Sequence, residues 1–140
     1  SGNNGQTGKG GHSHNDKLSF ELQVNGEDFV LDPGSYVYTE SINNRNLFRS
    51  TTAHFIPYFG EEQNRIDENC FCLQQETYCR VLKLTPIEMI FECQYRKHHH
   101  IRIFTLKENA LILEDRTKEL IVRMEPFRYY SKGYGKLKRR

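Results

Sequence analysis

The chain has 140 residues, which is enough for one domain with its own core and short for two. Its 20 lysines and arginines nearly balance 18 aspartates and glutamates, and a formal net charge of only +2 argues against a nucleic-acid partner. No apolar run reaches the length of about 18 residues that a membrane span needs, and the first residues lack the apolar core of a signal peptide.

The two ends differ in composition from the rest of the chain. Residues 1–11 hold five glycines among small polar residues, so we expect a flexible segment that lines a site only if something else orders it. Residues 136–140 form a basic tail, which we interpret as a solvated chain end rather than a binding patch. Between them the sequence predicts a single domain, so residues 1–140 are taken as one unit.

The first regular element is a predicted hairpin. Apolar and polar residues alternate over residues 17–24, a period of two that is typical of a half-buried strand. Asn25 and Gly26 follow at once, and this dipeptide suits the positive φ angles of a type I′ turn. Residues 27–31 then return, with Val24 expected opposite Glu27 and the other apolar pairs forming one face.

The remainder of the chain predicts more short strands separated by turn signals, with no sustained helical period. The candidate strands are Ala53–Phe59, Phe71–Gln75, Tyr78–Leu84, Glu88–Tyr95, His100–Lys107, Leu111–Glu114, Leu120–Met124 and Phe127–Tyr130. Many short strands of this kind are typical of two packed antiparallel sheets. We therefore predict an all-β fold, an antiparallel two-sheet β-sandwich.

A short run of metal-binding side chain types precedes the hairpin. His12, His14 and Asp16 alternate with other residues, so in an extended backbone they point to one side, and imidazole and carboxylate are ligands that zinc prefers. Asp32 and His54, at the ends of other predicted elements, could complete such a site. Asp32 is expected about 16 Å of extended chain from His14, so the run has to fold back across the sheet. The alternative is a polar loop whose histidines contact water.

Other polar groups suggest binding rather than metal chemistry. The segment after the Asp32-Pro33-Gly34 turn is rich in phenol, amide and guanidinium groups, which suit sugar hydroxyls and carboxylates, although an ordinary polar loop has the same composition. The candidates there are Tyr36, Tyr38, Asn46 and Arg49. His98, His99 and His100 should point to alternate faces of a strand and so cannot readily share one ion.

The cysteines leave two readings open. Cys70, Cys72, Cys79 and Cys93 could form two disulfides, but their spacing matches neither a zinc knuckle nor a redox motif. The plainer interpretation is that they are small residues filling strands.

Several motifs follow one another in a recognisable order. Residues 10–22 read GGHSHNDKLSFEL, residues 32–36 read DPGSY and residues 45–51 read RNLFRST; GEEQN at 60–64 and SKGYG at 131–135 are weaker echoes. In order and spacing this sequence strongly resembles the heparinase II/III-like polysaccharide lyase family, most specifically within residues 5–64. The resemblance implies an α/α toroid of helices followed by a β-sandwich, of which this chain covers the sandwich.

The resemblance also implies an activity and the residues behind it. Family members cleave uronic-acid polysaccharides by β-elimination, in which a base removes the C5 proton, the carboxylate is neutralised and an acid protonates the leaving oxygen. By this likeness His12 belongs to the catalytic centre, while His14, Asp32 and His54 are similar to the ligands of a structural divalent metal, for which zinc is the suited ion. The toroid supplies the remaining catalytic groups, so the chain alone is expected to be inactive.

A second hypothesis keeps the fold without the chemistry. The chain would then be a non-catalytic carbohydrate-binding or structural β-sandwich module. Under the first hypothesis the partners are an acidic polysaccharide and the helical domain, and the residues do not separate glycosaminoglycans from alginate or capsular polysaccharide. Family likeness favours a bacterial periplasmic or extracellular location, while the cysteines leave a cytoplasmic one open.

Overall fold

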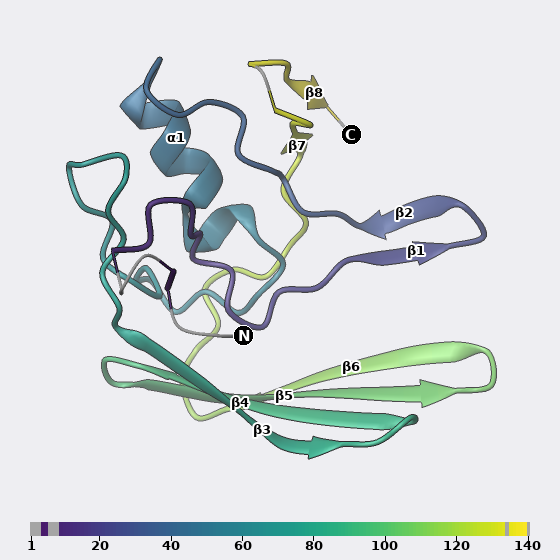
Figure 1. Ribbon diagram of the computed structural model, residues 1–140. Coiled ribbons are helices and arrows are strands. Elements are labelled where there is room, and N and C mark those ends of the chain that lie inside the picture. Colours follow the sequence, from purple (N-terminus) through teal and green to yellow (C-terminus); the bar gives the residue numbers. More distant parts are fainter. Residues whose placement is uncertain (1–3, 6–8, 134, 140) are drawn as a thin grey trace.

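The structure is a computed structural model that describes residues 4–5, 9–133 and 135–139 (Figure 1). Its elements in chain order are β1 (Leu22–Val24), β2 (Glu27–Val30), α1 (Ile42–Arg49), a 3-10 turn (Thr51–Ala53), β3 (Thr77–Leu84), β4 (Glu88–Tyr95), β5 (His98–Lys107), β6 (Ala110–Thr117), β7 (Tyr129–Tyr130) and β8 (Lys138–Arg139). All strand pairs are antiparallel, so the prediction of an all-β antiparallel fold is confirmed.

The second half of the chain folds into one four-stranded sheet in the order β3-β4-β5-β6. Each strand pairs with the next along the chain, and the register sets Cys93 opposite His100 and Phe91 opposite Arg102. Because side chains alternate across a strand, these four residues share one face. That face is the inner one, since Cys93, His100 and Arg102 are buried. His98 and His100 are buried and His99 is exposed, which confirms the predicted alternation.

The hairpin of β1 and β2 forms a second, smaller layer that lies opposite the four-stranded sheet (Figure 1). Asn25 has φ 52° and Gly26 has φ 84°, as the predicted type I′ turn requires. Val24 pairs with Glu27 as expected, but the register shifts before Gln23, so Leu22 pairs with Val30.

This hairpin is shorter than predicted and lacks the expected apolar face. Leu18 takes a positive φ of 68° and is buried in the core, so the chain before Leu22 leaves the hairpin. The ring of Phe20 packs edge-on against Phe104 of β5, with centroids 5.1 Å apart. Phe29, on the hairpin itself, is 56% exposed. Packing on the large sheet therefore removes Phe20 from the apolar face that was predicted for the hairpin.

A short helix occupies a segment that the sequence did not predict to be helical. The Ser41 hydroxyl caps α1 by accepting a hydrogen bond from the Asn44 backbone N–H at 3.3 Å. Its buried face consists of Arg45, Phe48 and Arg49. Two of these three are cations, so the helix carries no apolar stripe of the kind that signals a helix in a sequence.

Three predicted strands are mostly irregular. Within Ala53–Phe59 and Leu120–Met124 the ladder is limited to an isolated bridge between Tyr58 and Arg123, and Phe71–Gln75 contributes a bridge from Leu73 to Ile66. These segments are irregular connections between the helix, the hairpin and the sheet, and they add no strand to the sheet.

A buried ion pair within the four-stranded sheet holds two irregular segments of the first half of the chain against it. Arg102 of β5 is fully buried and makes two hydrogen bonds of 2.8 Å to the Asp115 carboxylate on β6. Its remaining terminal nitrogen donates to the backbone carbonyls of Leu18, at 2.7 Å, and Phe55, at 2.8 Å. Nearby, Leu18 packs in an apolar cluster with Phe59, Cys93 and Tyr95. Through the hydrogen bond of Arg102 and the packing of Leu18, the sheet fixes the segment that follows the H-x-H-x-D run.

The glycine-rich segment and the basic tail are both partly ordered. Residues 1–3 and 6–8, on which most of the predicted flexibility falls, lie outside the described residues. Lys9 accepts a backbone hydrogen bond from Leu73 at 2.8 Å, and the buried Asn4 side chain donates to the Leu73 carbonyl at 2.9 Å. In the tail, Lys138 pairs with Tyr130 in the β7–β8 ladder. No described helix is long and apolar enough to cross a membrane.

Candidate functional site

The H-x-H-x-D run folds back over the sheet, as a site built from it requires. Its backbone is tied to the helix where the Asn15 N–H donates to the Arg49 carbonyl at 2.9 Å. Ser19 N–H closes the run by donating to the Asp16 carbonyl at the same distance. We call residues 11–16 the motif loop.

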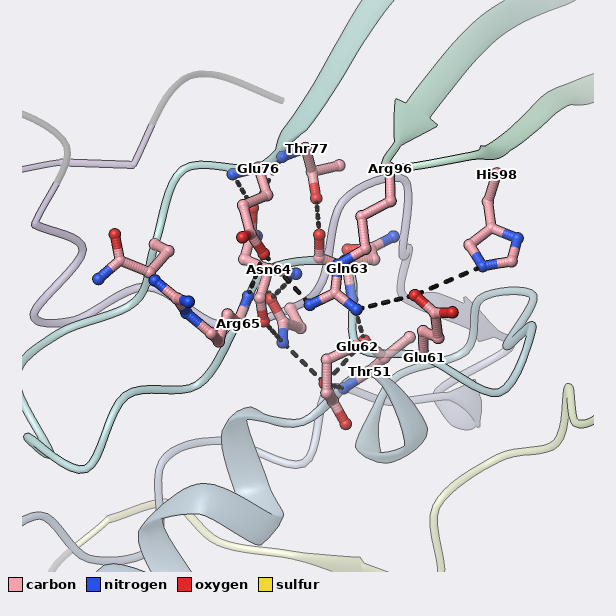
Figure 2. Close-up of polar contacts among 12 residues, drawn as sticks. Thr51, Glu61, Glu62, Gln63, Asn64, Arg65, Glu76, Thr77, Arg96 and His98 are labelled. Carbon is pink, nitrogen blue, oxygen red and sulfur yellow. Dashed lines mark hydrogen bonds and ion pairs between the residues drawn. The ribbon is translucent and has the colours of Figure 1, made fainter.

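A buried polar network behind the motif loop holds it in place (Figure 2). We call its centre, Glu62, Gln63 and Asn64, the polar clamp. The amide of Asn15 donates to the Glu62 carboxylate at 2.7 Å and to the Asn64 carbonyl at 2.8 Å. The Asn15 side-chain oxygen accepts from the Asn64 backbone at 2.9 Å and from its amide at 3.0 Å.

The same clamp reaches the 3-10 turn after α1 and the start of the four-stranded sheet. Glu62 also accepts from the backbone and the hydroxyl of Thr51, at 2.6 and 2.8 Å. Asn64 accepts from the backbone N–H groups of Glu76 and Thr77 at 2.9 Å, where β3 begins. Asn15, Gln63 and Asn64 are each fully buried. Since a buried polar group left unpaired costs roughly 1–3 kcal/mol, this set of mutually paired groups is stable only in one arrangement.

Gln63 fixes the downstream end of the loop. Its side-chain oxygen accepts from the Lys17 N–H and its amide donates to the Lys17 carbonyl, both at 2.9 Å. The Gln63 side chain thus makes the two hydrogen bonds to the Lys17 backbone that a neighbouring β-strand would otherwise make. Lys17 is therefore fixed although it belongs to no strand.

Arg45 of α1 holds the motif loop from the other side. Its side chain is fully buried and donates to His14 Nε2 at 3.1 Å and to the Gly11 carbonyl at 3.2 Å. Its guanidinium also lies 4.5 Å from the centre of the Tyr38 ring, a cation–π contact. One arginine therefore positions the residues on both sides of His12.

His12 is the exposed member of the motif loop. Its Nδ1 lies 3.4 Å from the hydroxyl of Tyr38, and the two rings meet edge to face with centroids 5.6 Å apart. The ring of Phe71 is also near, at 6.4 Å. A solvent-accessible imidazole in contact with a phenol has the components of a proton-transfer pair.

Of the three residues predicted as metal ligands, two form a pair and the third lies beside that pair. His54 is buried, and its Nδ1 lies 3.0 Å from Oδ2 of Asp32. The His14 ring lies 5.4 Å from the His54 ring. Asp32 is itself oriented by the Gly34 N–H, which donates to Oδ1 at 2.8 Å. In an extended chain His14 would lie far from Asp32, but the fold of the motif loop brings it close to the pair of Asp32 and His54.

Burial sets the charge of this cluster. Burial, together with the nearby His54 and Arg45, lowers the pKa of His14 to about 3, so the ring is neutral at physiological pH. Burial alone raises the pKa of Asp32, but the hydrogen bond and charge of His54 outweigh it and bring that pKa below its usual value. The cluster therefore offers a neutral His14 imidazole and the Asp32 carboxylate, the forms of these groups that bind metals.

The chemistry of the cluster fits a divalent ion better than its geometry does. Nε2 of His54 is buried without a hydrogen-bond partner in the described structure, and a carboxylate on the other ring nitrogen is the usual support of a metal-binding histidine. Yet Nε2 of His14 is engaged by Arg45. Over residues 4–5, 9–133 and 135–139, no group of three His, Cys, Asp or Glu side chains converges in a way that could hold a metal ion.

The predicted sugar-binding residues separate into two groups. Tyr38 is exposed beside His12 and lines a hollow of about 720 Å³ together with Tyr36, Glu40 and Lys132. The Tyr36 ring packs against Phe48, with centroids 5.1 Å apart.

Arg49 and Asn46 face the interior instead. Arg49 is fully buried and donates to four backbone carbonyls. Those carbonyls belong to Asp67, Asn69, Cys70 and Cys72. Its Nε donates to the Asn46 side chain at 2.9 Å. With its donors used in this way, Arg49 shapes the loop that carries Phe71 rather than presenting a charge to solvent.

Two features of the site were not predicted from the sequence. The role of Arg45 was hidden because its segment was expected to be a loop, and a buried arginine has no sequence signature. The polar clamp lies in GEEQN, which was noted only as an echo. Its glutamine and asparagine, followed by a strand, carry no pattern that predicts burial.

Comparisons with known proteins agree with the motif reading. Residues 1–69 match a family model described as heparinase II/III-like, C-terminal. No curated protein and no solved structure gave a significant match. The matched segment contains the motif loop, α1, Asp32, His54 and the polar clamp.

Proposed function

We propose that this chain, whose residues 1–69 of 140 match the heparinase II/III-like C-terminal family, is a polysaccharide-lyase-related domain that forms one wall of a lyase active site. The substrate of that site is a polysaccharide containing uronic acid, and the reaction is β-elimination.

One observation carries the proposal. The motif loop is held by Arg45 and the polar clamp so that His12 alone is exposed, beside the Tyr38 hydroxyl. A loop kept for stability alone needs no exposed imidazole held beside a phenol on so many buried supports. Positioning of this kind is what a proton-transfer group requires, because misplacement of the order of 1 Å lowers rates strongly.

The chemistry assigned to the pair follows from elimination. The C5 proton of the uronate is removed, the bond from C4 to the leaving oxygen breaks, a C4–C5 double bond forms and the leaving oxygen takes a proton. His12 serves as a proton-transfer group at this centre, and Tyr38 orients it and contacts the sugar. The group that neutralises the carboxylate, and a further acid or base, come from a helical domain opposite this wall.

A divalent ion, for which zinc is best suited, is part of the proposal. His14, Asp32 and His54 would hold it only after a rearrangement: His54 Nε2 is the available donor, while Asp32 pairs with the other ring nitrogen of the same histidine. Its contribution would be to tie the motif loop to the turn at Asp32, a structural role. His14 can join only if its nitrogen is released by Arg45.

Metal content tests this part. Elemental analysis of the purified chain, prepared without chelator, should give about one zinc per chain, and the His54→Ala and Asp32→Ala variants should lose it. His99→Ala is the matched control, since His99 lies exposed on the outer face of the sheet. Chain without metal under these conditions would leave the cluster as a hydrogen-bonded pair with a neighbouring histidine.

Substrate binding tests the wall itself. In calorimetric titration with uronic-acid oligosaccharides, His12→Ala and Tyr38→Ala should weaken binding at least about fivefold, roughly 1 kcal/mol. Tyr78→Ala is the control, because Tyr78 is an exposed tyrosine on β3, away from the motif loop. Equal affinity in all four proteins would exclude this surface.

A second function is favoured by one specific observation. The rings of Tyr38 and Phe71 are stacked at 13°, with centroids 6.2 Å apart, and both are exposed. Parallel exposed rings suit the apolar faces of sugars, so a non-catalytic carbohydrate-binding module is the alternative. Neutral oligosaccharides that bind as well as uronates, with the affinity of His12→Ala unchanged, would favour it.

Elimination activity, followed by the ultraviolet absorbance of its unsaturated product, is expected to be undetectable for the chain alone.

A further inference from the structure

We propose that Cys79 and Cys93 form a reversible disulfide across strands β3 and β4, a redox modification site under the motif loop. The two residues lie directly opposite each other in the antiparallel ladder. The thiol of Cys79 donates to the sulfur of Cys93 at 2.8 Å. This inference does not depend on the proposed lyase function.

The backbone already has the geometry that a disulfide needs. Opposed residues of an antiparallel pair have Cα atoms about 4.5–5.5 Å apart, which lies within the range of about 4.4–6.8 Å seen across disulfides. A covalent S–S bond is about 2.05 Å long, so the sulfurs need to approach by less than about 1 Å. Cross-linking therefore requires side-chain adjustment and no rearrangement of the sheet.

The two thiols differ in access, which sets the order of events. Cys79 is partly exposed and lies on β3, an edge strand of the four-stranded sheet. Cys93 is fully buried, and the hydrogen bond from Cys79 together with burial raises its pKa. An oxidant in solution therefore meets Cys79 first, and Cys93 acts as the resolving residue.

The reaction is a thiol–disulfide exchange with a small disulfide such as oxidised glutathione. The Cys79 thiolate attacks one glutathione sulfur, the S–S bond of glutathione breaks and one glutathione thiolate leaves. The Cys93 thiolate then attacks the Cys79 sulfur and expels the second glutathione. Two cysteine thiols are oxidised, one glutathione disulfide is reduced to two thiols, and the two protons from the cysteines end on glutathione.

The bond would act on the base of the candidate site. Cys93 belongs to the apolar cluster with Leu18, Phe59 and Tyr95, and Leu18 directly follows the segment that carries the motif loop. A cross-link between residues 79 and 93 closes a loop of about 15 residues, which lowers the entropy of the unfolded chain. Oxidation is therefore expected to raise the melting temperature by about 5–10 °C.

The test uses the full chain in glutathione buffers of increasing oxidising strength. After alkylation of the remaining thiols under denaturing conditions, mass spectrometry should find two of the four cysteines protected and a Cys79–Cys93 linked peptide, two hydrogen masses lighter. The rise in melting temperature should appear together with this peptide and be reversed by dithiothreitol.

Two variants make the result specific. The double variant Cys70→Ser, Cys72→Ser should still form the bond and show the same rise in melting temperature, because the two substituted residues lie outside the sheet. Cys79→Ser should show neither, and it changes the partly exposed partner, which packs at the edge of the apolar cluster, rather than the fully buried Cys93. Four alkylated cysteines at every redox poise, or a bond that joins any other pair, would overturn the proposal.

Discussion

Two buried histidines stand out at the scale of single residues. Both ring nitrogens of His98 and of His100 are buried without a hydrogen-bond partner among the residues described. They pack against Phe59, whose ring centre lies 5.2 Å from that of His98 and 5.7 Å from that of His100. The two rings therefore serve as aromatic filling of the core, and Nε2 of His98 also lies 3.9 Å from the Glu61 carboxylate (Figure 2).

This packing predicts that acid destabilises the fold through His100. Burial, and next the charge of Arg102, lowers the pKa of His100 from 6.5 to about 4. Above pH 6.5 the ring is neutral in both the folded and the unfolded state, so the stabilisation is fully present there. As the pH falls from 6.5 towards about 4, the unfolded chain binds a proton that the folded chain does not, and stability is lost.

Urea unfolding of the wild type and of His100→Phe checks this. Phenylalanine fills the same space beside Phe59 without titrating. The loss of unfolding free energy between about pH 7 and about pH 4.5 should be smaller in the variant by roughly 2 kcal/mol. Parallel pH profiles for the two proteins would contradict a titrating role for His100.

At the scale of elements, the sheet was predictable and the helix was not. Strand β4 was predicted with the bounds Glu88–Tyr95 that it has, and β3, β5 and β6 differ from prediction by a few residues at their ends. Their alternating pattern is a local property, so local reasoning finds it. Helix α1 is stabilised by the Ser41 cap and by tertiary partners of Arg45 and Arg49, which the sequence around them does not show.

The candidate site divides along the same line. The grouping of His14, Asp32 and His54 was anticipated from motif likeness, whereas the supports of the motif loop were not. Those supports are long-range hydrogen bonds, such as the pair between Asn15 and Asn64, which are 49 residues apart. Neither spacing nor periodicity encodes which of many asparagines finds such a partner.

The polar clamp gives a prediction at this scale. Asn64→Ala removes the acceptor of the Glu76 and Thr77 backbone groups and leaves the Asn15 side chain partly unpaired. The free energy of unfolding should fall by about 2–4 kcal/mol. The Asn15 amide should also exchange its hydrogen faster.

An exposed asparagine supplies the comparison. Asn44 lies on the solvent side of α1, and alanine favours helices, so Asn44→Ala should change stability by less than about 0.7 kcal/mol. Chemical denaturation measures both variants. If Asn64→Ala proves as mild as Asn44→Ala, the clamp is not the support of the motif loop.

For the whole molecule, Arg102 connects the four-stranded sheet to two irregular segments of the first half of the chain. Its partners lie in β6, in the segment after the motif loop and in the segment after His54. Arg102→Met should lower the free energy of unfolding by about 3–5 kcal/mol, because it leaves the Asp115 carboxylate buried and unpaired. It also leaves the backbone carbonyls of Leu18 and Phe55 without their hydrogen-bond donor. Arg116→Met is the control, since its ion pair with Glu114 is exposed.

Stability and site geometry should change together in that variant. The nuclear magnetic resonance signals of His12 and His14, recorded where the variant is still folded, are expected to shift or broaden in Arg102→Met and to stay unchanged in Arg116→Met. Unperturbed histidine signals in a strongly destabilised Arg102→Met would separate the sheet from the site.

The same arginine has a consequence for how the two halves of the chain tolerate substitution. The first half commits many particular side chains to particular partners, while the sheet supports the motif loop through a few inward positions, chief among them Arg102 with its partner Asp115. Elsewhere the sheet needs only alternation of apolar and polar residues, which very different sequences satisfy. We therefore expect most positions of the second half to tolerate substitution and few positions of the first half, which carries the family match over residues 1–69, to do so.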